Sequence, residues 1–211
     1  MTDRKSEEAL AESVAQLRTF PGIVFHLGGH SADDFTHADL AIKSAGVALD
    51  SPEITLARKN GVEVAMSTAL FAKYAMEAGA TIVGVTGTRG KSTVAHLIFH
   101  SVQRAGRRAH LGGNVRGIST LALLPKIERG DICVLELDSW QLQGFGDLHI
   151  SPNVSVFTNF MPDHQNYYPD METYFADKAN IFRYQTPDDF LFVGENIFEK
   201  ISAARPDTDS P

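Results

Sequence analysis

The segment Gly84-Val-Thr-Gly-Thr-Arg-Gly-Lys-Ser-Thr93 constrains the fold of this chain more than any other feature. An apolar, strand-like run precedes its glycines, and a helical pattern follows them. In such a turn the backbone N–H groups and the helix dipole point at one anion, and phosphate suits that position. We therefore expect an ATP-binding loop in which Lys91 neutralises phosphate charge and Ser92 offers a hydroxyl to Mg²⁺. The residues expected to bind the nucleotide are Gly87, Thr88, Arg89, Gly90, Lys91, Ser92 and Thr93.

The loop departs from the strict G-x-x-x-x-G-K-[ST] spelling, because position 85 is Val85 rather than glycine. Its glycines stand at 84, 87 and 90, which argues against an ordinary P-loop kinase or GTPase. The alternative is a tight strand-to-helix turn without a ligand, but such a turn needs neither Lys91 nor Ser92.

The pattern around this loop predicts an α/β fold. We expect strands at residues 81–85, 132–137, 154–158 and 190–193, with helices at 92–105 and 171–182. Strands that are apolar throughout and alternate with helices favour a mostly parallel sheet covered on both faces. Upstream we expect helices at 6–18, 52–60 and 67–78, and strands at 23–27, 39–44 and 62–66. We place the boundary between a small αβ domain, 1–79, and the phosphate-binding domain, 80–211, after Gly79.

Two expected strands end in polar side chains. Glu136 interrupts the apolar run Ile132-Cys-Val-Leu-Glu-Leu137, and a bound Mg²⁺ would offset the cost of burying its carboxylate. Asp163 and His164 follow the strand at 154–158 and form a second pair of possible ligands. Alternatively, Glu136 lies beyond its strand in solvent, and Asp163 and His164 bond their own loop backbone.

Other polar residues carry weaker signals. Lys178 lies in a helical pattern, where a lone lysine is normally solvated. His96 and His100 have the four-residue spacing of a helical metal site, but H-E-x-x-H is absent and we interpret them as ordinary helix residues. Trp140 is interpreted as a packing residue.

Composition limits the possible partners. The net charge of −7 argues against nucleic acid, which selects basic surfaces. No apolar run approaches the ~18 residues of a membrane span, and no signal peptide is visible, so we expect a cytoplasmic protein. The one cysteine, Cys133, lies in an apolar run and is expected to be a buried thiol.

Several of these segments together resemble the Mur ligases of peptidoglycan synthesis, in particular the branch that adds D-glutamate. The phosphate loop is similar, although Arg89 replaces the usual asparagine; so is Leu135-Glu-Leu-Asp-Ser-Trp-Gln-Leu142, although Asp138 replaces the usual serine. Gly112-Gly-Asn114 resembles the substrate-side loop. Asn159 to His164, followed by Tyr168-Pro169 and Lys178, resembles the motif that binds the second metal. Residues 34–52 resemble the end of the UDP-binding domain of this branch.

The resemblance implies that ATP phosphorylates the carboxylate of UDP-MurNAc-L-Ala and that the amine of D-glutamate attacks the resulting acyl phosphate. It implies a first Mg²⁺ held by Ser92 and Glu136, a second held with help from His164, and catalytic roles for Lys91, His164 and a carbamylated Lys178. Asn114 would contact the substrate, and Ser44, Ala45 and Gly46 would lie near the UDP moiety. The expected partners are these small molecules, and the expected state is a monomer.

Compared with that family, the chain is expected to be truncated at both ends and therefore to lack ligase activity alone. Two other hypotheses stay open. One is a catalytically incomplete ATP-binding module, and the other is a ligase of the folate or poly-γ-glutamate type, which the segment 34–52 disfavours.

Overall fold

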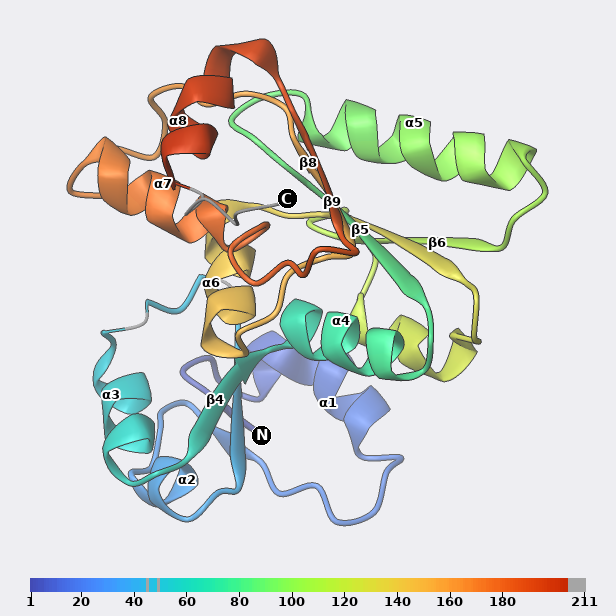
Figure 1. Cartoon of the computed structure of the whole chain (residues 1–211). Helices are drawn as coiled ribbons and strands as arrows, with labels where there is room; N and C mark the ends of the chain where they lie inside the picture. Colours follow the sequence, from blue (N-terminus) through green and yellow to red (C-terminus); the bar gives the residue numbers. More distant parts are fainter. Residues whose placement is uncertain (45, 49, 205–211) are drawn as a thin grey trace. The chain divides into compact units, whose positions relative to one another are not determined.

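A five-stranded parallel sheet forms the centre of the larger of two compact units in the computed structural model, which describes residues 1–44, 46–48 and 50–204 (Figure 1). Its strand order is β6-β7-β5-β8-β9, and each neighbouring pair is parallel. The strands are β5 (Thr81–Thr86), β6 (Ala109–Gly113), β7 (Ile132–Glu136), β8 (Val154–Phe157) and β9 (Phe190–Val193). The expected mostly parallel α/β sheet is confirmed.

Helices cover both faces of this sheet. The helices of this unit are α4 (Ser67–Glu77), α5 (Lys91–Arg104), α6 (Ser139–Asp147), α7 (Met171–Ala179) and α8 (Phe198–Ala204), with 3₁₀ turns η2 (Leu121–Lys126) and η3 (Glu195–Ile197). Alternation along β5 sends Ile82 into one core and Val83 and Val85 into the other. Helix α5 packs on the Val83 side through Ala95.

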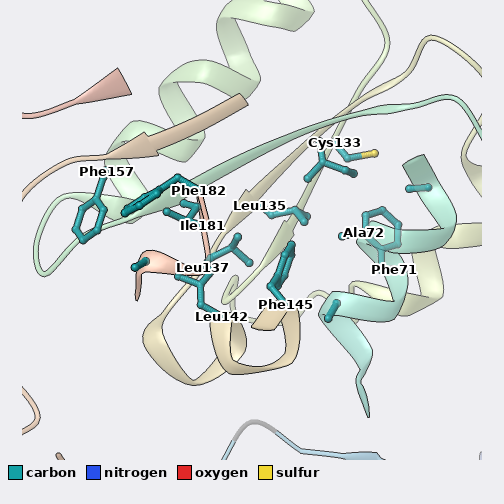
Figure 2. Packing of buried hydrophobic residues seen from close by; sticks show 14 of the residues in the cluster. Phe71, Ala72, Cys133, Leu135, Leu137, Leu142, Phe145, Phe157, Ile181 and Phe182 are labelled. Carbon is teal, nitrogen blue, oxygen red and sulfur yellow. The ribbon is translucent and has the colours of Figure 1, made fainter. Parts of the chain in front are cut away.

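The core on the opposite face is larger and is shared by α4, α6 and α7. Phe71, Phe145 and Phe157 are completely buried there, together with Leu135 and other apolar side chains (Figure 2). Cys133 also lies in this core, and burial raises the pKa of its thiol to about 12. The expectation of a buried thiol is therefore confirmed.

The smaller unit comprises Met1–Lys43 and Val47–Val64. It contains β1 (Thr2–Asp3) paired with β2 (His26–Leu27), η1 (Glu8–Leu10), α1 (Ala11–Leu17) and α2 (Asp33–Thr36). Strand β3 (Leu40–Lys43) pairs with β4 (Glu63–Met66), and α3 (Pro52–Lys59) lies between them in sequence. Its core gathers Phe35, Ile54, Ala57, Val62 and Val64.

The described structure differs from the expected elements in a few places. The sequence suggested a boundary after residue 79, whereas the two compact units divide between Val64 and Ala65. Helix α4 belongs to the larger unit because it packs on β5, α6 and η2. The strand expected at 23–27 is limited to His26–Leu27, and the helix expected at 171–182 ends at Ala179. Strand β6 and helix α6 were not predicted.

Candidate active site

The glycine loop connects β5 to α5 as the sequence predicted. Gly87 has φ 143° and Gly90 has φ 80°, which is backbone geometry that favours glycine. A Cβ at Gly87 would also clash with Thr158 Oγ1. Because Lys91 is the first residue of α5, the first N–H groups of that helix have no carbonyl partner within the helix and point into the loop. This is the geometry of an anion site.

Two lysine ammonium groups meet at one carbonyl of this loop. Lys91 Nζ donates to Gly87 O at 3.1 Å and to Thr88 O at 3.2 Å. Lys178 Nζ donates to the same Gly87 O at 3.0 Å and lies 3.4 Å from Thr86 Oγ1. The structure thus brings Lys178, 92 residues away from Thr86 in sequence, into the phosphate loop.

Lys178 is 1% exposed, so its side chain is not solvated as that of a lone helix lysine normally is. Burial, and after it the nearby Lys91 charge, lower the pKa of its amine to about 7. Asp138, Asp163 and Asp177 act in the opposite direction. Near neutral pH, a large fraction of Lys178 is therefore an uncharged amine, which is the nucleophilic form.

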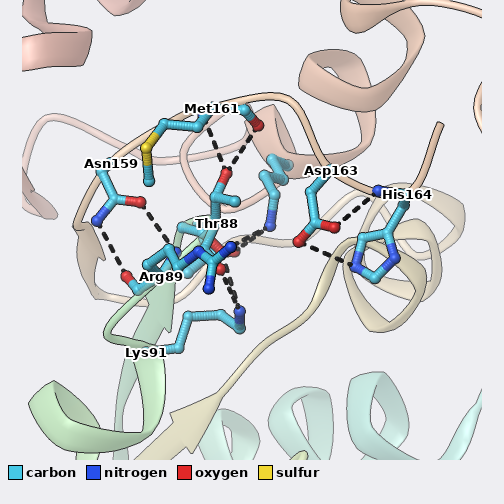
Figure 3. Close-up of polar contacts among 10 residues, drawn as sticks. Thr88, Arg89, Lys91, Asn159, Met161, Asp163 and His164 are labelled. Carbon is cyan, nitrogen blue, oxygen red and sulfur yellow. Dashed lines mark hydrogen bonds and ion pairs between the residues drawn. The ribbon is translucent and has the colours of Figure 1, made fainter.

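A segment that follows β8 holds the loop in place (Figure 3). Asn159 accepts from Arg89 N at 2.9 Å through Oδ1 and donates to Arg89 O at 3.0 Å through Nδ2. Thr88 N donates to Asn159 O at 3.0 Å, and Thr88 Oγ1 bonds the backbone of Met161. Thr158 Oγ1 donates to Arg89 O at 2.7 Å. We call residues 158–161 the loop clamp.

From the residue pattern alone, Asp163 and His164 were the candidates after this strand, and the loop clamp was not predicted; Asn159 entered only through the resemblance to the metal-binding motif. The available signal was position, because polar residues directly after a strand of a parallel sheet reach the loop after the neighbouring strand. Both polar groups of Thr88 bond to this clamp: its N–H donates to Asn159 O, and its hydroxyl bonds the backbone of Met161.

Glu136 is the last residue of β7 and is 5% exposed. Within the described residues, its carboxylate has no hydrogen-bond or ion-pair partner. Its backbone pairs with Val85 of β5 and Gly113 of β6. Glu136 therefore lies at the carboxyl end of these parallel strands, where the glycine loop begins. The solvated alternative for Glu136 is therefore wrong.

Asp163 and His164 lie beyond the loop clamp (Figure 3). His164 has φ 51°, an uncommon conformation for a residue with a side chain. His164 N donates to Asp163 Oδ1 at 2.9 Å, and His164 Nε2 lies 3.8 Å from Asp163 Oδ2. Both side chains are partly exposed and accessible to a ligand.

The remaining predicted residues are placed as follows. Ser92 and Thr93 are exposed in the first turn of α5. Asn114 is exposed directly after β6, and its N–H donates to Glu136 O at 2.7 Å. Ser44 and Gly46 are exposed after β3, whereas Ala45 lies outside the described residues.

No preformed metal cage exists in the part of the chain that the structure describes, since no three His, Cys, Asp or Glu residues group together there. His96 and His100 lie with ring centroids 6.5 Å apart, and His96 Nδ1 is 2.8 Å from Ser92 O. This agrees with their interpretation as ordinary helix residues.

Among the described residues, no helix is long and apolar enough to cross a membrane.

The fold and the loop define an α/β protein with an anion site of the P-loop type. The family profile described as "Mur ligase middle domain" matches residues 85–207, more than half of the chain. The chain belongs to the Mur ligase family.

Its curated relatives include UDP-N-acetylmuramoylalanine–D-glutamate ligases. The protein from Anaeromyxobacter dehalogenans is 41% identical over 189 residues, which are 90% of this chain and 39% of that protein. The protein from Borreliella afzelii is 36% identical over 187 residues, 88% of this chain and 39% of that protein. The chain thus spans about two fifths of the length of these relatives.

Solved structures show the same fold. UDP-N-acetylmuramate:L-alanyl-γ-D-glutamyl-meso-diaminopimelate ligase from Neisseria meningitides has a TM-score of 0.57 at 14% identity, over 96% of this chain and 66% of that one. A UDP-N-acetylmuramoyl-L-alanyl-D-glutamate–2,6-diaminopimelate ligase has a TM-score of 0.50 at 19% identity, over 82% of this chain and 44% of that one.

Proposed function

We propose that this chain carries the ATP-binding centre of a ligase that joins D-glutamate to UDP-N-acetylmuramoyl-L-alanine. The observation that carries the proposal is the convergence of Lys91 and Lys178 on Gly87 O, at the open N-terminus of α5. The names of the curated relatives supply the two substrates.

The reaction requires activation of a carboxylate, which is a poor electrophile. The γ-phosphoryl group of ATP passes to a carboxylate oxygen of the substrate, and ADP leaves. The amine of D-glutamate then attacks the acyl carbon, phosphate leaves with its bonding electron pair, and the amine loses a proton. The first N–H groups of α5 and the Lys91 ammonium would hold the phosphate oxygens, where negative charge is concentrated during transfer.

The residues at the strand ends fit a divalent cation. Glu136 supplies a buried carboxylate without a partner among the described residues, and Ser92 supplies an exposed hydroxyl. Such a cation would neutralise charge on the phosphates. Mg²⁺ is commonly held by one or two carboxylates together with substrate phosphates, so the lack of a three-residue cage is compatible with it. His164 would contribute to a second site.

Lys178 fits the carbamylation that the family resemblance implies. Carbamate formation on CO₂ requires a neutral amine, and the pKa of about 7 provides one near neutral pH. A carbamylated Lys178 would be an anion near the phosphate loop and would support the metal sites.

On the substrate side, Asn114 would contact the sugar nucleotide, and Ser44 and Gly46 would lie near its UDP moiety. Ala45 is assigned with them by sequence alone. We further propose that the protein acts in the cytoplasm as a monomer on small-molecule substrates.

Calorimetric titration with a non-hydrolysable ATP analogue and Mg²⁺ tests the phosphate site. The wild-type chain should bind, Lys91→Ala should lose at least about tenfold in affinity, and the exposed Lys126→Ala should bind like the wild type. Equal binding by Lys91→Ala and Lys126→Ala would refute the assignment. Turnover of UDP-N-acetylmuramoyl-L-alanine with D-glutamate, followed by phosphate release, should be undetectable with this chain alone, which spans about two fifths of its relatives' length, and detectable turnover would contradict that expectation.

A further inference from the structure

Trp140, the single tryptophan of the chain, lies next to His164. It is the second residue of α6, whose start is fixed by a capping box in which Asp138 Oδ1 accepts from Gln141 N at 2.7 Å and Gln141 Oε1 accepts from Asp138 N at 3.4 Å. Asp138 also follows Glu136 by two residues. The position of Trp140 is therefore tied to the strand end that carries the buried carboxylate.

The indole packs directly on the imidazole. The ring centroids of Trp140 and His164 are 4.7 Å apart with an interplanar angle of 53°. Tyr167 contacts the indole edge to face at 5.5 Å, and Tyr174 contacts the imidazole at 6.0 Å with an angle of 76°. The imidazole thus lies between aromatic side chains from α6 and α7.

Polar contacts alone do not orient this imidazole. Across the described residues, no hydrogen bond to its ring nitrogens is found, and the ion-pair distance to Asp163 Oδ2 is 3.8 Å. The backbone of His164 is also in the left-handed region, at φ 51°, which a side chain normally disfavours. A ring that lacks hydrogen bonds takes its orientation from packing, and Trp140 provides the shortest ring contact.

We infer that Trp140 is a positioning residue that holds the imidazole of His164 in the orientation required to bind a divalent cation beside the phosphates. The inference rests on the proposed function for the cation, but the contact itself can be measured without any ligand. Packing of one aromatic pair of this kind corresponds to about a two- to tenfold effect on an equilibrium.

The first arm of the test is NMR of the ligand-free chain. In the wild type, nuclear Overhauser contacts should join the indole of Trp140 to the imidazole of His164, and the His164 Hε1 signal should carry a ring-current shift. The shift should be lost in Trp140→Leu and largely kept in Trp140→Phe. An unchanged His164 signal in a folded Trp140→Leu protein would overturn the inference.

The second arm uses Mn²⁺ as the probe, with its affinity measured by water-proton relaxation in the presence of a non-hydrolysable ATP analogue. Trp140→Leu should bind Mn²⁺ about two- to tenfold more weakly, and Trp140→Phe should stay close to the wild type. Affinity for the nucleotide without metal should not change. In a His164→Ala background, Trp140→Leu should have no further effect, because the group that it positions is gone.

An equal loss of Mn²⁺ affinity from Trp140→Leu in the His164→Ala background would show a merely structural role and would overturn the inference. If the wild-type chain binds neither the nucleotide analogue nor Mn²⁺, the proposed function fails, and the NMR arm alone decides whether Trp140 orients His164. Phe190→Ala, which removes an aromatic ring that is 62% exposed on β9, is the control and should change neither measurement.

Discussion

The side chain of Asn159 and the backbone of Arg89 exchange two hydrogen bonds. Arg89 N donates to Asn159 Oδ1 at 2.9 Å, and Asn159 Nδ2 donates to Arg89 O at 3.0 Å. A single amide therefore satisfies both polar groups of one residue in the phosphate loop. Because Gly87 and Gly90 give this loop little conformational preference of its own, the loop depends on such external contacts for its shape.

Asn159→Ala should weaken nucleotide binding about tenfold, because both bonds to Arg89 are lost and the loop must be ordered when the ligand binds. Calorimetric titration with the ATP analogue measures this. The free energy of unfolding should fall by about 1–2 kcal/mol in urea denaturation.

Asn153→Ala is the matched control. Asn153 also bonds the backbone, since its Oδ1 accepts from Ile82 N at 2.9 Å, but it lies at the opposite end of β5 from the loop. Its replacement should cost similar stability and leave nucleotide affinity unchanged. If both variants lost affinity equally, the effect would come from stability, and the clamp would have no specific role.

Lys178 should make stability depend on pH. In the folded chain the pKa of the Lys178 amine is about 7, whereas an ordinary lysine has a pKa of 10.5. Between these values the unfolded chain binds a proton that the folded chain does not, so the contribution of Lys178 to the free energy of unfolding rises with pH across this window. Below about pH 7 both states are protonated, and the full cost of burying the charge remains.

Lys178→Met keeps an unbranched side chain that is one atom shorter and removes its charge. At about pH 6 it should be more stable than the wild type by about 1 kcal/mol or more, and the difference should shrink toward pH 10. Urea denaturation in CO₂-free buffer measures this without carbamate formation. The exposed Lys126→Met should show no such trend, and a constant difference for Lys178→Met would contradict the lowered pKa.

The sequence predicted the glycine loop between β5 and α5 and most of the sheet because their signals are local. The apolar run into Gly84, the glycines and Lys91 all lie within one short segment. Strand β6 was missed because Ala109–Gly113 ends in two glycines, which normally argue against a strand. They are needed here because a Cβ at Gly113 would collide with the backbone of Glu136.

The parts of the site that could not be predicted from the residues depend on long-range contacts. Lys178 is buried where its side chain reaches Thr86 and Gly87 at the end of β5, and its own segment of sequence does not indicate that burial. Only the family resemblance gave Lys178 a role. The bonds between Asn159 and Arg89 join residues 70 positions apart and have no signal in either segment.

Glu136→Gln should separate metal binding from nucleotide binding. It removes the negative charge of a buried group and keeps its shape, so the nucleotide should bind similarly without metal. The gain in nucleotide affinity on adding Mg²⁺ should fall about tenfold or more, because Mg²⁺ loses its carboxylate ligand. Paired titrations with and without Mg²⁺ measure this, with the exposed Glu199→Gln as control. A Mg²⁺ effect of wild-type size in Glu136→Gln would show that this carboxylate does not hold the metal.

Gly113 and Gly117 offer a direct test of the packing that places Glu136. Both have positive φ, 85° and 79°, but a Cβ at Gly113 would overlap the backbone of Glu136, whereas a Cβ at Gly117 meets nothing within 4 Å. Gly117→Ala should therefore cost only the conformational strain, about 1 kcal/mol. Gly113→Ala should cost that strain and an additional ~1–3 kcal/mol for overpacking, and it should also lower nucleotide affinity by displacing the strand end. Chemical denaturation and titration of the two variants decide the matter, since equal losses of stability would mean that β6 and β7 are not packed as closely as the structure has them.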